Sequence, residues 1–387
     1  MSAAERAVDK HEFFPGLEGL RGYCILIVFI AHYLGPAVLP TDGSPVLAFL
    51  EKCLTGFQFV VPVFFVISGF MISDILLETH ERQGYFAAFY SRRLLRICPA
   101  YFLTLCVLAA LHAFKNTPID PRFWTNFLFV QNLLPGYLFS HTVPSINEIG
   151  HLWFIAVIFQ FYLLWPVVVW LFPHRGQLLR ITWTLIALIC AIRVAAPFLH
   201  LSVNDSYVST ATRADAILLG VALSLYRRNV VYKRLEAWAG GAAVLAMAAL
   251  IFIALWTGTG WPKSYRRVAV IHPLANIAAA LLVIAVMKPN SYFCRICSLG
   301  WARWLGNLSF AIYVFHFAYS KWFLGSLTPR LAALMPLSQA LTISALAAFA
   351  LTIALAVFNR RFVEQPIRSL TSRIKYGQQR TLPTVST

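Results

Sequence analysis

Apolar residues along this chain come in long blocks that are separated by short polar joins. Each block holds about 18 or more residues, which is the length that an α-helix needs to cross a bilayer. The pattern predicts an all-α fold, a polytopic transmembrane helix bundle of ten spans. The spans are expected near residues 18–38, 55–77, 96–114, 150–172, 179–198, 213–226, 238–256, 269–287, 305–324 and 338–358.

The chain shows neither a fixed-period repeat nor a separate soluble segment. It is therefore interpreted as a single membrane domain over residues 1–387, with short tails at about 1–15 and 369–387. The longest join, residues 115–149, carries apolar residues at helical spacing, which predicts a surface or re-entrant helix. An ordinary interfacial helix is the alternative.

Composition supports the membrane assignment. Residues of the hydrophobic types make up 59% of the chain and charged residues only 12%, against roughly 25% charged in soluble domains. The net charge of +17 comes from basic residues spread over the joins, so a nucleic-acid partner is not expected. With both termini cytosolic, roughly two-thirds of the 32 Lys and Arg residues would lie on the cytosolic side, as the positive-inside rule requires.

The first span carries two ionisable residues, Arg21 and His32. They are eleven positions apart, so both side chains lie on one helix face, separated by ~16 Å along the axis. Charges inside spans are expensive, which makes each of them a functional candidate. A neutral buried imidazole can take a proton from an alcohol, so His32 is a candidate general base. A histidine that only hydrogen-bonds a neighbouring helix is the alternative.

Three arginines, Arg92, Arg93 and Arg96, precede the third span. Arg93 and Arg96 share a helix face on the side predicted to be cytosolic. Guanidinium groups there suit the phosphates of a nucleotide-like donor such as coenzyme A. A plain positive-inside anchor is the alternative.

Further polar residues stand in or beside the apolar blocks: Glu148, His151, Gln160, Arg213, Asp215 and His316. Contacts that stabilise the bundle are the alternative reading for each of them. The sequence has no HExxH motif or other cluster with ligand spacing, and Cys294 and Cys297 form a lone CxxC. No metal site is expected.

Taken in order, several of these segments resemble the acyltransferase-3 family of membrane acyltransferases, which O-acylate cell-surface and secreted sugars. The similarity runs from about Phe14 to Arg368. The matching segments are Gly19-Leu-Arg21-Gly with His32, Phe64-Phe65-Val-Ile-Ser68-Gly69-Phe70, Arg93-Leu-Leu-Arg96, His151-Leu-Trp153-Phe with Gln160-Phe-Tyr162, Arg213-Ala-Asp215-Ala, Leu305 to His316 with Tyr313, and Arg361-Phe-Val-Glu364-Gln-Pro366.

The resemblance implies that His32 acts at the acyl-transfer step and that cytosolic Arg93 and Arg96 hold acyl-CoA. It also implies a multi-pass protein of the bacterial inner membrane, with acetyl as the usual acyl group. One departure concerns the fourth span, where Ile158 and Phe159 stand at positions that are acidic in many members. Glu148 and Asp215 are the candidate substitutes for the carboxylate that orients His32. In the first span, Glu18 stands where Asp is commoner.

These observations predict an O-acyltransferase that moves an acyl group from cytosolic acyl-CoA to a carbohydrate-type hydroxyl. His32 would act as the base, or would carry the acyl group itself, since imidazole is also a nucleophile. Polysaccharide, lipid-linked oligosaccharide, glycolipid and macrolide-like sugars are all left open as acceptors. The rival function is a transporter or flippase for a lipid-linked sugar or drug, which predicts internal pseudo-symmetry between two halves.

Overall fold

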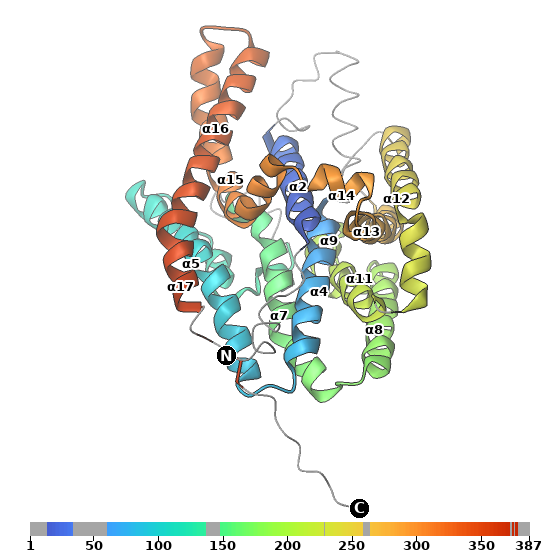
Figure 1. The fold of residues 1–387 in the computed structure, drawn as a ribbon. Helices are drawn as coiled ribbons and strands as arrows, with labels where there is room; N and C mark the ends of the chain where they lie inside the picture. The colour runs from blue at the N-terminus through green and yellow to red at the C-terminus, as the bar shows by residue number, and fades with distance from the viewer. Residues whose placement is uncertain are drawn as a thin grey trace, which may run out of the picture.

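The structure, a computed structural model, describes residues 14–33, 60–136, 148–227, 229–257 and 264–371, together with 374, 376 and 377. Apart from one isolated bridge residue, the regular structure in these ranges is helical, which confirms the all-α prediction (Figure 1). The longer helices are α2 (Pro15–Tyr33), α4 (Val60–Thr79), α5 (Tyr85–Phe114), α7 (Trp153–Leu171), α8 (Arg175–Ala195), α11 (Asp215–Tyr226), α12 (Val230–Thr257), α13 (Tyr265–Met287), α15 (Gly300–Ala332) and α16 (Leu337–Asn359).

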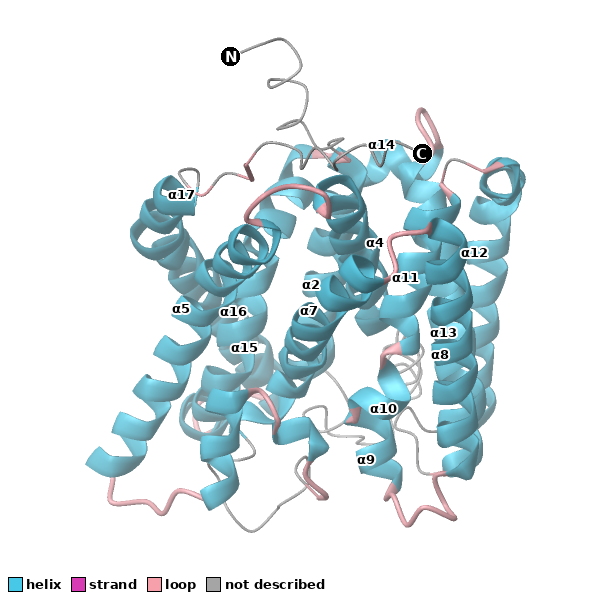
Figure 2. Cartoon of the chain, turned by 90° about the horizontal axis from the view of Figure 1, so that it is seen from below, coloured by secondary structure: helices cyan, strands magenta, loops and turns pink. Residues whose placement is uncertain are grey.

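Shorter elements cap the two ends of the bundle. They are η2 (Pro121–Leu128), η3 (Gln131–Leu133), η5 (Gly150–Leu152), α9 (Val203–Val208), α10 (Thr210–Arg213), α14 (Tyr292–Cys297), η6 (Arg360–Glu364) and α17 (Gln365–Thr371). Figure 2 shows α14 and α17 at one end of the bundle and α9 and α10 at the other. These are called the α17 end and the α9 end below.

Seven of the described helices are long and apolar enough to cross a membrane: α4, α5, the η5–α7 segment, α8, α12, α13 and the α16–α17 segment. The chain is therefore an integral multi-pass membrane protein. The remaining predicted spans coincide with α2, α15 and the shorter α11, which has 12 residues.

Several boundaries differ from the sequence prediction: α12 begins at Val230 and not at 238, α15 continues to Ala332 and not 324, and α5 differs most. The third span was expected from residue 96, but α5 begins at Tyr85, so the arginines lie within the helix and not in front of it. In the 115–149 join, the expected helix is replaced by the short 3₁₀ helices η2 and η3. Asp120 caps η2, and Pro121 occupies its first turn. Asp120 and Pro121 thus begin a helix there, but its geometry is that of a 3₁₀ helix, whereas the spacing of the apolar residues had indicated an α-helix.

Helices α2 and α15 pack with their backbones in direct contact along a seam of glycines. A Cβ atom added at Gly22 would lie 2.0 Å from the Ala302 carbonyl oxygen, and one at Gly306 would lie 1.7 Å from the Glu18 carbonyl oxygen. Small residues allow such close approach, as is common between membrane helices. Figure 1 shows α2 beside α15 in the middle of the molecule.

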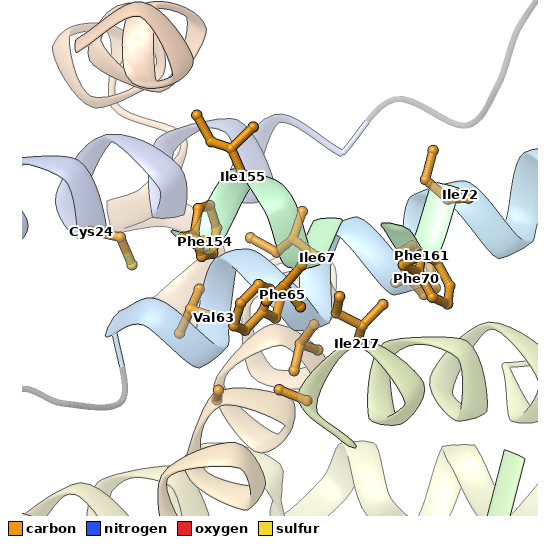
Figure 3. Packing of buried hydrophobic residues seen from close by; sticks show 14 of the residues in the cluster. Cys24, Val63, Phe65, Ile67, Phe70, Ile72, Phe154, Ile155, Phe161 and Ile217 are labelled. Atoms are coloured by element: carbon orange, nitrogen blue, oxygen red, sulfur yellow. The ribbon is translucent and has the colours of Figure 1, made fainter. Parts of the chain in front are cut away.

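Aromatic and branched side chains fill the space between α4, α7 and α11. In Figure 3, Phe65 of α4 lies close to Phe154 of α7 and near Ile217 of α11. The ring centroids of Phe65 and Phe154 are 4.5 Å apart, and both side chains are buried. Contacts of this kind hold α7 against α4, and these two helices form two walls of the cavity described next.

Candidate active site

Three arginines from two helices meet at one cavity. Arg21 of α2 and Arg93 and Arg96 of α5 line one partly open cavity. Two of these residues are half-buried, whereas Arg96 is exposed. Guanidinium groups gathered in this way can donate several hydrogen bonds to phosphate oxygens. The sequence predicted the Arg93–Arg96 pair; the structure adds Arg21 to it.

Beyond the arginines, the cavity wall is mostly apolar. Its other lining residues come from α4, α5, α7 and α15: Phe64, Ser68, Met71, Ile72, Ile97, Phe154, Ile155, Ile158, Tyr162, Ser309, Phe310 and Tyr313. Arg21 donates a hydrogen bond from Nη2 to the Met71 sulfur at 3.0 Å. The cavity is therefore cationic where the arginines stand and apolar elsewhere, as a ligand with a charged head and an uncharged arm requires.

Arg92 and Arg93 face different surroundings although they are adjacent. The Arg93 guanidinium lies over the rings of Phe89 and Tyr162, at 5.6 and 5.7 Å, and its Nε is buried without a hydrogen-bond partner among the described residues. Arg92 instead donates from Nε and Nη2 to the Ile374 carbonyl oxygen, at 3.1 and 2.5 Å. The structure thus separates Arg92 from the cavity and gives it a contact with the C-terminal segment.

The imidazoles of His32 and His316 form a hydrogen-bonded pair at the end of α2. Nδ1 of His32 lies 3.2 Å from Nε2 of His316, and Nδ1 of His316 lies 2.8 Å from the Tyr313 carbonyl oxygen. Because a carbonyl only accepts, His316 must carry its proton on Nδ1, which leaves Nε2 as the acceptor in the neutral ring. His32 then donates from Nδ1. We assign the lone pair of His32 to Nε2, the nitrogen that a general base uses.

Burial differs sharply between the two rings. His316 is fully buried at 0% exposure, and Tyr33 donates to its backbone carbonyl at 2.7 Å. The His32 side chain is exposed. The His316 ring is held inside the bundle, whereas the His32 ring is accessible, and the structure gives its Nε2 no hydrogen-bond partner among the described residues.

Tyr313 links the arginine cavity to the histidines. Its side chain lines the cavity, and its ring centroid lies 5.5 Å from His316 and 5.3 Å from His151. Its hydroxyl donates to the His151 carbonyl at 2.6 Å. His32 is not among the lining residues of this cavity. The cavity and the exposed His32 ring are therefore neighbouring features that Tyr313 connects.

The carboxylates that the sequence offered for orienting His32 are engaged elsewhere. Glu148 lies 3.0 Å from Nε2 of His112, and Asp215 accepts from Arg193 at 2.5 Å. Glu18 pairs with Arg303 at 3.4 Å. The expectation of a carboxylate partner from Glu148 or Asp215 is thus wrong for this arrangement. An imidazole, His316, takes the orienting position.

Gln160, Trp153 and Arg213 lie outside the His32 pair. Gln160 donates to the Phe129 carbonyl and to Asn132, at 2.7 and 2.8 Å. It therefore connects α7 to the segment between α5 and α7. The Arg213 guanidinium lies over Trp153 at 5.5 Å. His151 is 7% exposed, and both of its ring nitrogens lack a partner among the described residues.

Sequence reasoning missed two buried ionisable residues, Arg193 and His272, which are 1% and 2% exposed. Both stand inside apolar blocks, so the rule that singles out charges within spans would have found them. It also missed the part that Met71, Tyr162 and Ser309 have in the cavity wall. Apolar and small residues in helices carry no signal that separates a cavity wall from ordinary packing.

The helical bundle thus places an arginine-lined cavity next to a pair of hydrogen-bonded imidazoles. A family model, the acyltransferase domain, matches residues 14–359. The chain belongs to the acyltransferase-3 family, as the sequence motifs predicted.

Curated relatives are similar over nearly the whole chain. A putative peptidoglycan O-acetyltransferase, YrhL of Bacillus subtilis, is 27% identical over 93% of the chain and 56% of its own length. The peptidoglycan O-acetyltransferase OatA of Listeria monocytogenes is 26% identical with the same coverage. The O-acetyltransferase OatA of Staphylococcus aureus is 23% identical over 92% of the chain and 57% of its own length. The chain thus spans somewhat more than half the length of these relatives. No solved structure matches.

Proposed function

We propose that the protein is an O-acyltransferase that moves an acetyl group from cytosolic acetyl-CoA to a hydroxyl of a carbohydrate acceptor at the opposite face of the membrane. The observation that carries the proposal is the pairing of His32 with His316, because it leaves an exposed imidazole with its Nε2 lone pair free. The curated relatives named as peptidoglycan O-acetyltransferases support a surface glycan as the acceptor class.

The orientation follows from the charges. Arg92, Arg93 and Arg96 lie in the first half of α5, and Arg227 follows α11. With ten spans and both termini cytosolic, these arginines are at the cytosolic side, in keeping with the positive-inside rule. The α17 end of the bundle is then the cytosolic end, and the α9 end faces outward.

The donor binds at the arginine cavity. The phosphates of acetyl-CoA pair with Arg96, Arg93 and Arg21, and its uncharged pantetheine arm extends along the apolar wall toward Tyr313. Guanidinium groups are suited to this task because they stay charged and present several N–H donors to phosphate oxygens. This placement carries the thioester toward the histidines and leaves the charged nucleotide near the water.

The transfer step uses the free nitrogen of His32. The acceptor hydroxyl gives its proton to Nε2 as its oxygen attacks the thioester carbonyl carbon. The carbon–sulfur bond then breaks, and the sulfur leaves as the thiol after taking up the proton. In the variant mechanism, Nε2 attacks the thioester carbonyl carbon and the thiolate of CoA leaves. The acceptor oxygen then attacks the acyl-imidazole, the carbon–nitrogen bond breaks, and the hydroxyl proton neutralises the thiolate. In both routes His316 holds the ring by accepting the hydrogen bond that His32 donates from Nδ1.

The test is transfer by purified protein in proteoliposomes, with radiolabelled acetyl-CoA outside and a glycan acceptor inside. Replacing His32 with Ala is expected to lower transfer by roughly 10²–10⁴-fold, the usual contribution of a general base. His174→Ala is the control, because His174 is an exposed histidine between α7 and α8. Transfer at the wild-type rate by the His32 variant would refute the proposed function.

A further inference from the structure

A second group of buried polar side chains lies apart from the histidine pair. It comprises Arg193 of α8, Arg213 of α10, Asp215 of α11, and His272 and Asn276 of α13, and is called the polar cluster below. The five residues are between 1% and 3% exposed. Arg193 binds Asp215 at 2.5 Å and the Thr212 carbonyl at 2.6 Å, which ties α8 to the start of α11.

Several hydrogen-bond donors and acceptors of the polar cluster are unpaired among the described residues. Within the described ranges, six of its buried atoms have no hydrogen-bond partner: Arg193 Nη1, Arg213 Nε, Asp215 Oδ1, both ring nitrogens of His272, and Asn276 Oδ1. Buried polar groups are nearly always paired in proteins, and unpaired ones are costly. Several such atoms in one place, from four helices, indicate a site for a polar ligand.

The chemistry of these atoms restricts the ligand. The arginine nitrogens are donors, the Asp215 and Asn276 oxygens are acceptors, and a neutral His272 offers one of each. An anion would leave the acceptors unpaired, and a cation would leave the donors unpaired. Hydroxyl groups both donate and accept, so water or a polyhydroxylated molecule matches the whole set, and the neighbouring aromatic rings favour the second.

Aromatic rings stand against the polar cluster. The Arg213 guanidinium lies over Tyr207 at 5.0 Å, over Trp153 at 5.5 Å and over Phe65 at 6.0 Å. The Tyr207 ring is also 5.3 Å from His272. Asp215 is paired with Arg193, and the Arg213 guanidinium lies over aromatic rings instead. Arg213 can therefore bind a ligand while the Arg193–Asp215 ion pair stays intact. Flat apolar rings next to hydroxyl-binding groups suit the apolar face of a sugar ring.

The polar cluster is also on the side from which the acceptor would enter. Arg193 is near the last residue of α8, and Arg213 and Asp215 are where α10 meets α11, so the group lies toward the α9 end (Figure 2). His32 is in the last turn of α2, away from α14, which packs on its first half at Gly19. Trp153 follows His151 by two residues, and the His151 ring is 5.1 Å from His316.

We propose that the polar cluster, with Trp153 and Tyr207, is the subsite that binds a sugar ring of the acceptor beside the histidine pair. This inference rests on the proposed function and names the groups that select a carbohydrate. Asn276 and His272 bind its hydroxyls, and Arg213 and the rings hold its face. These residues contact the acceptor, whereas the arginines of the cavity contact the donor.

The experiment compares the full-length wild-type chain with Asn276→Leu in detergent, using labelled acetyl-CoA and two acceptors, an N-acetylglucosamine oligosaccharide and glycerol. Acetyl-CoA hydrolysis is measured in parallel. The variant is expected to raise the KM for the oligosaccharide about tenfold, the scale of one lost hydrogen bond. It should leave the KM for acetyl-CoA unchanged and should not lower the melting temperature, because an unpaired buried group is removed.

Arg213→Lys is the second variant, since it keeps the charge while losing the planar group and its Nε. It is expected to raise the oligosaccharide KM at least fivefold and to leave the KM for acetyl-CoA unchanged, because Arg213 does not line the arginine cavity. Thr182→Val is the matched control, because Thr182 of α8 is buried and bonds only within its own helix.

The outcomes separate the two proposals. Lower melting temperatures with an unchanged oligosaccharide KM would mean that the polar cluster is structural, and would overturn the subsite. Wild-type protein that hydrolyses acetyl-CoA through His32 but acylates glycerol as readily as the oligosaccharide would also overturn it. Absence of both hydrolysis and transfer in the wild type would refute the proposed function itself.

Discussion

His32 and His316 stand 3.2 Å apart, and the direction of the hydrogen bond between them is set three residues earlier, at the Tyr313 carbonyl. Because that carbonyl fixes the proton on Nδ1 of His316, each ring has one tautomer. The pair thus resembles a base with an orienting partner, in which the partner is a neutral imidazole and not a carboxylate. A neutral partner orients the base but offers less stabilisation to an imidazolium than a carboxylate would.

Replacing His316 tests the orienting role directly. His316→Leu removes the acceptor for the Nδ1 proton of His32, so kcat is expected to fall by about 10–100-fold, as for other residues that orient a functional imidazole. His316→Gln can still present a carbonyl oxygen to His32 and is expected to recover part of the loss. The acetyl-CoA KM should change little in both variants.

The measurement is kcat and KM for each variant, with the pH dependence of kcat. Equal losses for Leu and Gln, with a matching fall in melting temperature, would show that His316 only supports the fold. An unchanged kcat in both would remove His316 from the mechanism.

The arginine cavity predicts a donor-specific defect. Arg96→Ala and Arg93→Ala are each expected to raise the KM for acetyl-CoA by about tenfold or more, on the scale of a charge-assisted hydrogen bond. The acceptor KM should stay constant. Arg92→Ala is the internal control, because Arg92 contacts Ile374 and not the cavity. An equal effect at Arg92 and Arg96 would favour a general electrostatic role over a defined donor site.

The glycine seam between α2 and α15 predicts a coupled loss of stability and activity. Gly22→Ala places a Cβ 2.0 Å from the Ala302 carbonyl oxygen, so the helices must separate. Overpacking of this kind costs about 1–3 kcal/mol. Since His32 and His316 stand on these two helices, transfer should fall with stability.

Gly241→Ala is the control, because nothing lies within 4 Å of a Cβ added there in α12. Alanine favours a helix over glycine by up to about 1 kcal/mol, so this variant should be equal to or more stable than the wild type. Thermal melting in detergent and the transfer assay give both readouts. A Gly22 variant with wild-type melting and transfer would contradict the close packing.

Acid should weaken the ion pair between Asp120 and Arg122, which lies at η2 between α5 and α7. The Arg122 side chain donates to the Asp120 carboxylate, at 2.6 Å for Nη2, and this holds the pKa of Asp120 below its usual value. A carboxyl group with a lowered folded pKa adds stability above its unfolded pKa, and the contribution is lost as pH falls through the folded pKa.

Asp120→Asn keeps a side-chain cap for η2 but removes the charge. The wild-type chain should therefore melt at a higher temperature than the variant at neutral pH, and the difference should vanish at a pH below the lowered pKa. Melting curves over that range give the answer. A difference that persists at the lowest pH would mean that capping geometry, and not charge, is responsible.

The sequence predicted more of the fold than of the site. Span positions follow from blocks of apolar residues, and α8, α12 and α13 contain the predicted core of their spans, each beginning at least one turn earlier than predicted. Helix ends were harder, because Tyr85 to Ser91 is less apolar than the rest of α5 yet continues the helix. Local composition could not show that α5 extends this far.

For the site, Arg93, Arg96 and His32 were expected from charge and motif, and the addition of Arg21 to the cavity depended on how α2 packs against α4. The orienting residue could not be predicted, since a carboxylate was sought by analogy and His316 stands 284 positions along the chain from His32. Which polar side chains meet across a bundle is set by helix rotation and register. Neither can be read from one segment.

The absence of side chains along the seam between α2 and α15 has a mechanical consequence. Two helices that touch backbone to backbone cannot slide or tilt past each other without a clash, so the histidines they carry keep a constant spacing through each round of the reaction. Under the proposed function, an acceptor therefore has to reach His32 without any separation of α2 from α15. The close contact between α2 and α15 thus holds His32 and His316 at a fixed distance from each other.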